Sequence, residues 1–402
     1  MATSNPFSAI DASLGYLYQV RAGLLWSLQR LRCDEPFLVS IESVDDVAFE
    51  SLGDDPSVLL QTKHHASRTA TLTDASPDIW KTLRVWIEGS VAGIVPPHSS
   101  LCLVTTGTAP AGSAASMLRM SERNVGAARG LLDATARTSR SETNASAYVA
   151  YEALSPAARD ALLERVIVID AAPTVSDLND SLRTEVFWAV DRSHQVSFLD
   201  RLEGWWFRRV ILQLTGAPGD RIGSVEVEAQ MAELRDQFRQ DSLPIDDDLL
   251  DFELDEATEH AHAEHLFVKQ IEIIAAGKRR IANAIRDYYR AYEQRSRWLR
   301  EDLVVGLDLR RYERRLMEEW AAVFEAMRDE LGTDATDVAK LAAARTVLTW
   351  AERASCPIRP GVTEPFLCKG SLHMISDEGR IGWHPEFQGL LADLIVSGRG
   401  SA

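Results

Sequence analysis

The segment from residue 39 to residue 65, VSIESVDDVAFESLGDDPSVLLQTKHH, gathers residue types that hydrolytic metal sites use. Cleavage of a phosphodiester by a divalent cation needs oxygen ligands that converge on one point, and a positive group for the charge that develops. Asp46 and Glu42 offer carboxylates, Gln61 offers an amide carbonyl oxygen and Lys63 offers an ammonium group. The segment therefore predicts a site for Mg²⁺ or Mn²⁺.

The spacing of these residues fits two neighbouring strands. Gln61 and Lys63 stand at positions i and i+2, so on a strand their side chains share a face. Asp46 at the mouth of the preceding strand would face them, and Glu42 lies across a short bend. Lys63 would then orient the attacking water or stabilise the pentavalent transition state. The alternative is a purely structural role, in which Asp45 or Asp46 caps an acid-rich turn beside an ordinary strand.

The elements that would position this site form an α/β domain over residues 1–175. Helical spacing runs from Ser8 to Arg32, and again from Pro77 to Ile94. Strand-like runs are Phe37–Ile41, Val44–Phe49, Val58–His64, Leu101–Thr106 and Arg165–Ile169. We expect this domain to be a sheet with helices packed against it.

The rest of the chain predicts mainly helices. Helical periodicity marks Leu178–Val190, Phe198–Leu214, Val225–Gln240, His260–Leu303, Leu307–Leu331 and Val338–Ala354. We assign residues 176–355 to a helical assembly and regulatory domain, in which residues 260–300 could form one long helix. Residues 356–402 are rich in Gly and Pro, which predicts a small separate module of turns and short strands.

Charge and composition set limits on the partners. The 402 residues carry a net charge of −17, with an acidic run over residues 246–264 and a basic stretch over residues 269–300. Because most non-specific affinity for DNA comes from Lys and Arg, this charge predicts that a partner supplies basic surface. The four scattered cysteines, the absence of a long apolar run and the absence of a signal peptide favour a cytoplasmic chain without membrane contact.

Residues 8–175 resemble the PD-(D/E)XK nuclease superfamily in its QxK variant. The branch is the DNA-endonuclease effector domain of CD-NTase-associated antiphage systems. The motif residues are Gly15-Tyr-Leu-Tyr-Gln19, Ile41-Glu42, Asp45-Asp46-Val47, Gln61-Thr-Lys63-His64, Leu72-Thr73-Asp74 and Asp78-Ile79-Trp80-Lys81-Thr82-Leu83. The resemblance implies a restriction-endonuclease-like fold, a double-stranded DNA substrate and a magnesium or manganese cofactor. It gives Asp46, Gln61 and Glu42 metal-binding roles, makes Lys63 catalytic and places Gln19 beside the site.

The second half resembles the C-terminal region of ABC-three-component system proteins. The motif residues are Leu202-Glu-Gly-Trp-Trp206, Asp241-Ser-Leu-Pro244, Arg311-Tyr-Glu-Arg-Arg-Leu316, Glu319-Trp320, Gly370-Ser-Leu-His373 and Ile381-Gly-Trp-His-Pro385. In these prokaryotic conflict systems a variable effector is joined to this region. The resemblance implies two partner proteins, an ABC-type ATPase and a small middle component. A homo-oligomer is a further open alternative.

Several other features have both a functional and a structural interpretation. His260, His262 and His265 could hold a metal, although an acidic helix start explains them as well. His65 shares a face with Lys63, and either it contacts substrate or, with His64, it simply ends the strand. His373 and His384 are interpreted as packing or hydrogen-bonding groups, and Asp377 as part of a turn. The basic face between Lys278 and Arg315, which holds Tyr288 and Trp298, could bind nucleic acid by stacking, but its interleaved acids favour ion pairs.

Two functions of different classes follow. The first is a metal-dependent DNA endonuclease of an antiphage system, held silent by its helical half until partner subunits act. The second is a non-catalytic adaptor that keeps a degenerate nuclease fold. No Walker A sequence is present, so an ATPase, if involved, is another chain.

Overall fold

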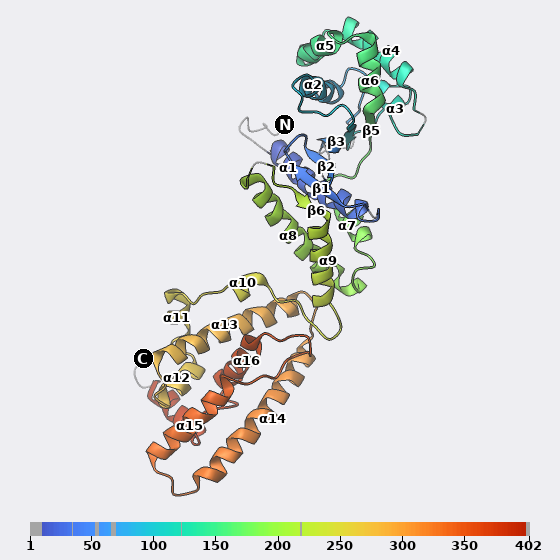
Figure 1. Ribbon diagram of the computed structural model, residues 1–402. Coiled ribbons are helices and arrows are strands. Elements are labelled where there is room, and N and C mark those ends of the chain that lie inside the picture. Colours follow the sequence, from blue (N-terminus) through green and yellow to red (C-terminus); the bar gives the residue numbers. More distant parts are fainter. Residues whose placement is uncertain are drawn as a thin grey trace, which may run out of the picture. The chain divides into compact units, whose positions relative to one another are not determined.

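A computed structural model describes residues 10–33, 35–52, 56–65, 70–121, 123–217 and 219–398. The chain divides into two compact units, residues 1–234 and residues 235–402 (Figure 1). Within the described residues no helix has the length and apolar character needed to cross a membrane.

Unit 1 is an α/β unit built on one mixed sheet. Its strands are β1 (Phe37–Ile41), β2 (Val47–Ser51), β3 (Pro56–Lys63), β4 (Ser100–Thr105), β5 (Val166–Ile169) and β6 (Ile222–Gly223). Its helices are α1 (Ile10–Arg30), α2 (Pro77–Val91), α3 (Ala114–Met117), α4 (Val125–Thr138), α5 (Ala145–Glu152), α6 (Pro156–Arg165), α7 (Leu178–Glu185), α8 (Gln195–Thr215) and α9 (Ser224–Gln237). The strand order is β5-β4-β3-β2-β1-β6. The pairs β3–β4 and β4–β5 are parallel, and the others are antiparallel.

The core of unit 1 forms where the apolar sequence runs predict it. The middle of β4 is a buried Leu-Cys-Leu-Val run, and such continuous apolar strands are typical of a sheet covered on both faces. Helix α2 begins at an N-cap, where the Ser76 hydroxyl accepts from the Asp78 N–H. Its Trp80 and Trp86 side chains are buried in the main core cluster of this unit. The α2 helix and the three strands predicted before it are present, with β2 at Val47–Ser51 where Val44–Phe49 was expected, and β3 at Pro56–Lys63 where Val58–His64 was expected.

The first unit extends well beyond the predicted boundary at residue 175. Helix α8 packs against β1, and β6 adds a short strand to the edge of β1. The Gln213 side chain hydrogen-bonds to both the N–H and the carbonyl of Ile41, at 3.1 and 3.3 Å. The indole of Trp206 donates to the carbonyl of Val20 at 2.7 Å. The structure groups α8 and β6 with the strands before residue 175, because they cover the edge strand β1.

Unit 2 is helical over its described residues. Its helices are α10 (Asp247–Leu250), α11 (Glu256–His262), α12 (Leu266–Ile273), α13 (Lys278–Arg300), α14 (Gly306–Leu331), α15 (Asp337–Ala351), α16 (Pro365–Asp377) and α17 (Phe387–Gly398) (Figure 1). The single long helix considered for residues 260–300 is instead three helices. The break before α13 falls at Ala275, which has a φ of 51°, and at Gly277, the N-cap of α13.

The predicted turn-rich terminal module is also wrong. Residues 365–377 form α16, which packs closely on α13 and belongs to the same core cluster. Trp383, after α16, is fully buried in that cluster. Gly370 is required here for packing, because a Cβ at this position would lie 2.0 Å from the carbonyl oxygen of Asp287. In this position glycine allows two helices to approach closely and does not mark a turn.

Candidate active site

The candidate site lies where β1, β2 and β3 end side by side. The antiparallel register pairs Ile41 with Val47, and Val47 with Leu60. Continued by one residue, it places Glu42 opposite Asp46 and Asp46 opposite Gln61. The N–H of Glu42 donates to the Asp46 carbonyl at 3.0 Å, which shows that the pairing continues to this point. The sheet thus brings together three of the four predicted site residues in one row.

Asp46 is the centre of this row. Its Oδ1 accepts a hydrogen bond of 2.5 Å from the Gln61 amide. Its Oδ2 accepts from the N–H and the hydroxyl of Thr62, at 2.6 and 2.8 Å. Both Asp46 and Gln61 are buried. The sequence pattern does not predict the contact of Thr62 with Asp46, because strand alternation puts the Thr62 side chain on the other face from Gln61.

Glu42 stands at the solvent side of the row. It is exposed and adopts a left-handed backbone with a φ of 52°. Desolvation of its carboxyl, and then the negative charge of Asp46, raise the pKa of Glu42. A hydrogen bond with Gln19 on α1 and the charge of Lys63 act in the opposite direction. Gln19 therefore lies beside the site, as the resemblance implied, and its buried Oε1 has no hydrogen-bond partner among the described residues.

Lys63 follows Gln61 on the same face of β3 and is half-buried. Its ammonium group makes no hydrogen bond or ion pair with the described residues, but its charge opposes the rise in the pKa of both Glu42 and Asp45. The Lys63 ammonium group therefore affects these carboxyl groups by its charge, without direct contact.

The Asp45 carboxylate contacts different groups from the Asp46 carboxylate. Its Oδ2 accepts from the indole N–H of Trp86 at 2.7 Å, and its Oδ1 accepts from the Asp46 N–H at 2.9 Å. Burial raises the pKa of Asp45 to about 6. Asp45 thus ties the bend before β2 to α2, which is a structural role that the sequence left open between Asp45 and Asp46.

The two histidines after Lys63 anchor the end of β3. His65 Nε2 lies 2.6 Å from the Asp78 carboxylate on α2, and its N–H donates to the Thr106 hydroxyl. His64 accepts a hydrogen bond from the Val175 N–H at 3.4 Å and packs against the Tyr18 ring. These contacts favour the structural interpretation of both residues.

The donor set of the row suits a hard divalent cation. Asp46 and Glu42 supply carboxylate oxygens, and a half-turn of the Gln61 amide would present its Oε1 in place of Nε2. The repulsion between Glu42 and Asp46 is the kind that a cation relieves. Over the described residues no group of three or more His, Cys, Asp or Glu side chains is placed to hold a metal. Any such site here therefore depends on Gln61.

Two of the three clustered histidines, His262 and His265, are engaged in polar contacts within unit 2. His265 Nδ1 lies 2.8 Å from Asp377, which also accepts from the Tyr288 hydroxyl at 3.3 Å. His262 Nδ1 contacts the Thr258 carbonyl at 2.8 Å. Asp377, at the end of α16, thus joins the segments that carry His265 and Tyr288 to its own helix, and no pattern in the sequence indicates this role. These contacts occupy the groups that a metal at this cluster would need.

The basic stretch of α13 is likewise largely committed to contacts within unit 2. Arg297 bonds to both carboxylate oxygens of Asp248 at 2.7 Å, and Arg295 pairs with Glu313. Trp298, a predicted stacking residue, is fully buried and donates to the Pro244 carbonyl. It is therefore not available for stacking on bases, and the expected ion pairs are present.

Comparison with known proteins identifies a family for part of unit 2. Residues 267–391 match the family model for C-terminal domain 7 of the ABC-three component systems. The match supports the predicted resemblance of the C-terminal region to that of ABC-three-component system proteins. A comparison with curated proteins gave no match.

Proposed function

We propose that this chain is a metal-dependent DNA endonuclease and the effector subunit of an ABC-three-component antiphage defence system. One observation carries the catalytic part: Asp46 and Gln61 touch at the ends of β2 and β3, with Glu42 opposite and Lys63 two residues on. The match of residues 267–391 supports the assignment to such a system.

In this proposal Asp46, Gln61 and Glu42 hold Mg²⁺ or Mn²⁺. When bound, the cation supplies an activated water at neutral pH and neutralises charge on the phosphate. Lys63 orients the attacking water and stabilises the negative charge that develops on the phosphoryl oxygens. Proton competition at Glu42, whose pKa is raised, weakens cation binding as the pH falls. Asp45 and Trp86 fix the bend that places Asp46.

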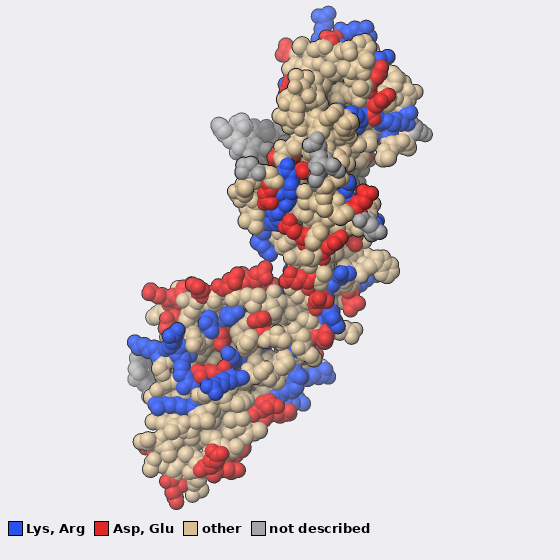
Figure 2. Space-filling view, in the orientation of Figure 1, with Lys and Arg blue, Asp and Glu red and all other residues tan. Residues whose placement is uncertain are grey.

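Partner proteins complete the proposed function. The net charge of −17 opposes unaided DNA binding. Figure 2 shows acidic side chains along the edge of unit 2 where Figure 1 places α10 and α11. An ABC-type ATPase and a small middle component, as in the systems that the match names, would contribute basic surface and the activating signal.

The test is plasmid cleavage by the chain together with the proteins encoded beside it, in Mg²⁺. Lys63→Ala and Asp46→Asn should each reduce the cleavage rate by about 100-fold or more. Asp46→Asn preserves the fold, because a flipped Gln61 amide can accept from the new side-chain NH₂ while the Asn oxygen faces Thr62. Lys81→Ala, at an exposed position on α2, is the matched control and should cleave normally. Undiminished cleavage by both site variants would refute the assignment.

A second function, a non-catalytic adaptor, is favoured by one specific observation. Both oxygens of Asp46 already accept hydrogen bonds from three donors of Gln61 and Thr62. A scaffold would keep this closed arrangement, whereas a nuclease must open it to a cation. Titration of the intact chain with Mn²⁺, followed by electron paramagnetic resonance, separates the two. Binding that Asp46→Asn abolishes supports the nuclease, and equal weak binding by both chains supports the adaptor.

A further inference from the structure

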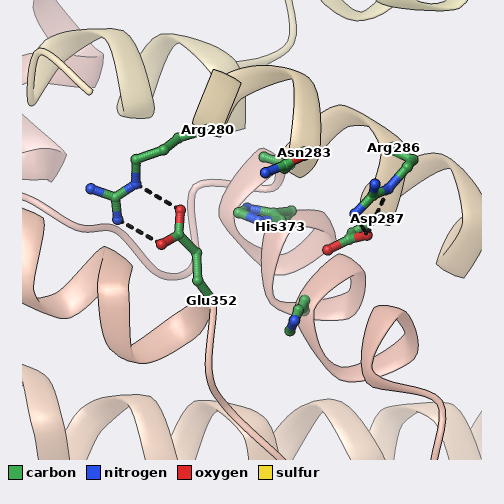
Figure 3. Close-up of a pocket in the computed structure, with 8 residues that line it drawn as sticks. Arg280, Asn283, Arg286, Asp287, Glu352 and His373 are labelled. Atoms are coloured by element: carbon green, nitrogen blue, oxygen red, sulfur yellow. Dashed lines mark hydrogen bonds and ion pairs between the residues drawn. The ribbon is translucent and has the colours of Figure 1, made fainter. Parts of the chain in front are cut away.

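Unit 2 contains a cavity of about 250 Å³ that the proposed nuclease does not use (Figure 3). It lies between α13, the C-terminal end of α15 and α16. Its lining residues are Arg280, Asn283, Ala284, Arg286, Asp287, Glu352, Lys369 and His373. Three of these carry a positive charge and two carry a negative one, so the lining has an excess of cationic and N–H donor groups.

The two arginines retain donors after their internal ion pairs are made. Arg280 binds Glu352 through Nε and Nη2, at 2.7 and 2.9 Å, and Arg286 contacts Asp287 through the same two atoms at 3.4 and 3.3 Å. The Nη1 group of each makes no hydrogen bond with the described residues. The Lys369 ammonium group makes neither a hydrogen bond nor an ion pair within that part of the chain, and its charge acts on the Asp287 carboxyl without direct contact. The cavity thus keeps one ammonium group that makes no hydrogen bond to the described residues, and two guanidinium edges able to donate.

His373 lies between the two ion pairs in Figure 3. It is only 2% exposed, and its Nδ1 has no hydrogen-bond partner among the described residues. The ring packs between Phe267 and Trp383, with centroid distances of 5.6 and 5.8 Å. A buried polar atom without a partner costs about 1–3 kcal/mol, and native proteins retain few of them. A ligand in the cavity that bonds to this ring would remove the cost.

The start of α13 strengthens the positive potential here. Its first residues are Lys278, Arg279 and Arg280, with no acid in the first turn and no side-chain cap on Gly277. Cations at a helix N-terminus oppose the helix dipole and reduce helix stability. In Figure 2 basic side chains gather on this part of unit 2. The arrangement is unfavourable for the helix alone and favourable for an anion bound beside it.

We propose that this cavity is a binding site for the phosphoryl group of a small molecule, recognised by Lys369, the free edges of Arg280 and Arg286, and His373. Several donors arranged around one small space suit a tetrahedral oxyanion, which offers more acceptor atoms than a carboxylate. The volume holds a phosphoryl group or a short phosphate chain, and it is below the range typical of drug-sized ligands. The site is independent of the Asp46 row.

The test is calorimetric titration of the full chain with inorganic phosphate and pyrophosphate at low, constant ionic strength. Lys369→Gln should weaken binding by about tenfold, the loss of one charge-assisted contact. Lys278→Gln is the matched control, because this exposed lysine lies on the same helix end outside the cavity lining. It should weaken binding less than about twofold. Arg286→Gln is a second site variant in case Lys369→Gln does not fold.

A spectroscopic measurement separates the cavity from the general basic surface. In a chain with ¹⁵N-labelled histidine, phosphate should shift the ring resonances of His373, assigned through His373→Gln. The absence of binding, the absence of this shift, or equal weakening by Lys369→Gln and Lys278→Gln would overturn the proposal. Acetate that binds as tightly as phosphate would assign the cavity to an acidic side chain of a partner protein, and would also overturn it.

Discussion

The amide of Gln61 donates a hydrogen bond of 2.5 Å to the carboxylate of Asp46, across the neighbouring ends of β3 and β2. In the nuclease resemblance, Gln61 stands where many such sites have a carboxylate, and Asp46 is the acid that the resemblance expects. With Nε2 toward Asp46 the pair is stable without a cation. With Oε1 turned inward, the pair would offer two oxygen ligands to the cation of the proposed nuclease. In the proposed nuclease, the orientation of this one amide would decide whether the row is closed by its own hydrogen bond or presents oxygen atoms to a cation.

Replacing Gln61 with glutamate tests this relationship directly. In the absence of divalent cations, the new carboxylate lies against Asp46, and the free energy of unfolding should fall by about 1–3 kcal/mol. Mg²⁺ or Mn²⁺ should restore the stability by neutralising the pair, and should raise the melting temperature of Gln61→Glu more than that of the natural chain. Thermal denaturation in EDTA and in each cation measures both effects.

The control for that prediction is Asp46→Asn in the Gln61→Glu background. It removes the like-charge contact and should abolish most of the extra cation response. If Gln61→Glu responds to Mg²⁺ no more than the natural chain does, the side chains of positions 46 and 61 do not form a cation site.

The candidate row could be predicted from sequence because it depends on local rules. Strand alternation puts Gln61 and Lys63 on one face, and a short bend returns Asp46 beside them. The contacts of Asp46 with Thr62, and of Asp45 with Trp86, could not be predicted, because they depend on the tilt of a single carboxylate at the end of a strand.

The domain boundary could not be predicted for a different reason. Periodicity identifies α8 as a helix but does not reveal which surface its apolar side covers. The two-residue strand β6 is too short to leave a pattern in the sequence. In unit 2, the glycine content around Gly370 predicted turns, but the residue lies within a helix and allows close packing against a second helix.

The extended first unit predicts how fragments of the chain behave. Residues 1–234 should fold alone and unfold in one cooperative transition, because they retain α8, β6 and the Arg21–Glu203 ion pair of 2.7 Å. Residues 1–175 should aggregate or remain unfolded, because they expose β1 and the groups that Trp206 and Gln213 satisfy. Circular dichroism and size-exclusion chromatography of the two fragments measure the difference. A well-folded 1–175 fragment would contradict this boundary.

The ion pair after β5 predicts a pH dependence. Burial alone would raise the pKa of Asp170, but hydrogen bonds from Arg119 and from the Ala109 N–H lower it below its usual range. A lowered pKa stabilises the folded chain above about pH 4, and this contribution is lost as the pH falls through the folded value. Arg119→Met should therefore lower the free energy of unfolding by about 2 kcal/mol at pH 7.

The difference in the free energy of unfolding between Arg119→Met and the natural chain should decrease steadily in denaturant titrations carried from pH 7 to pH 3. The control is Arg129→Met, which removes the more exposed pair with Asp160 and should cost less than about 1 kcal/mol. A gap that stays constant with pH would show that Arg119 acts by packing alone.

The contact between α13 and α16 predicts a strong effect of one methyl group. A Cβ at position 370 would lie 2.0 Å from the Asp287 carbonyl oxygen and 2.6 Å from the Ala291 Cβ. Because both neighbours belong to a helix in the core, neither can move without shifting α13, and Gly370→Ala should destabilise the chain by about 2–4 kcal/mol. Gly389→Ala on α17 is the matched control, since nothing lies within 4 Å of its added Cβ. Alanine there should stabilise the helix by about 0.5–1 kcal/mol. Equal stability of the two variants in denaturant titrations would mean that α13 and α16 do not pack as closely as the structure shows.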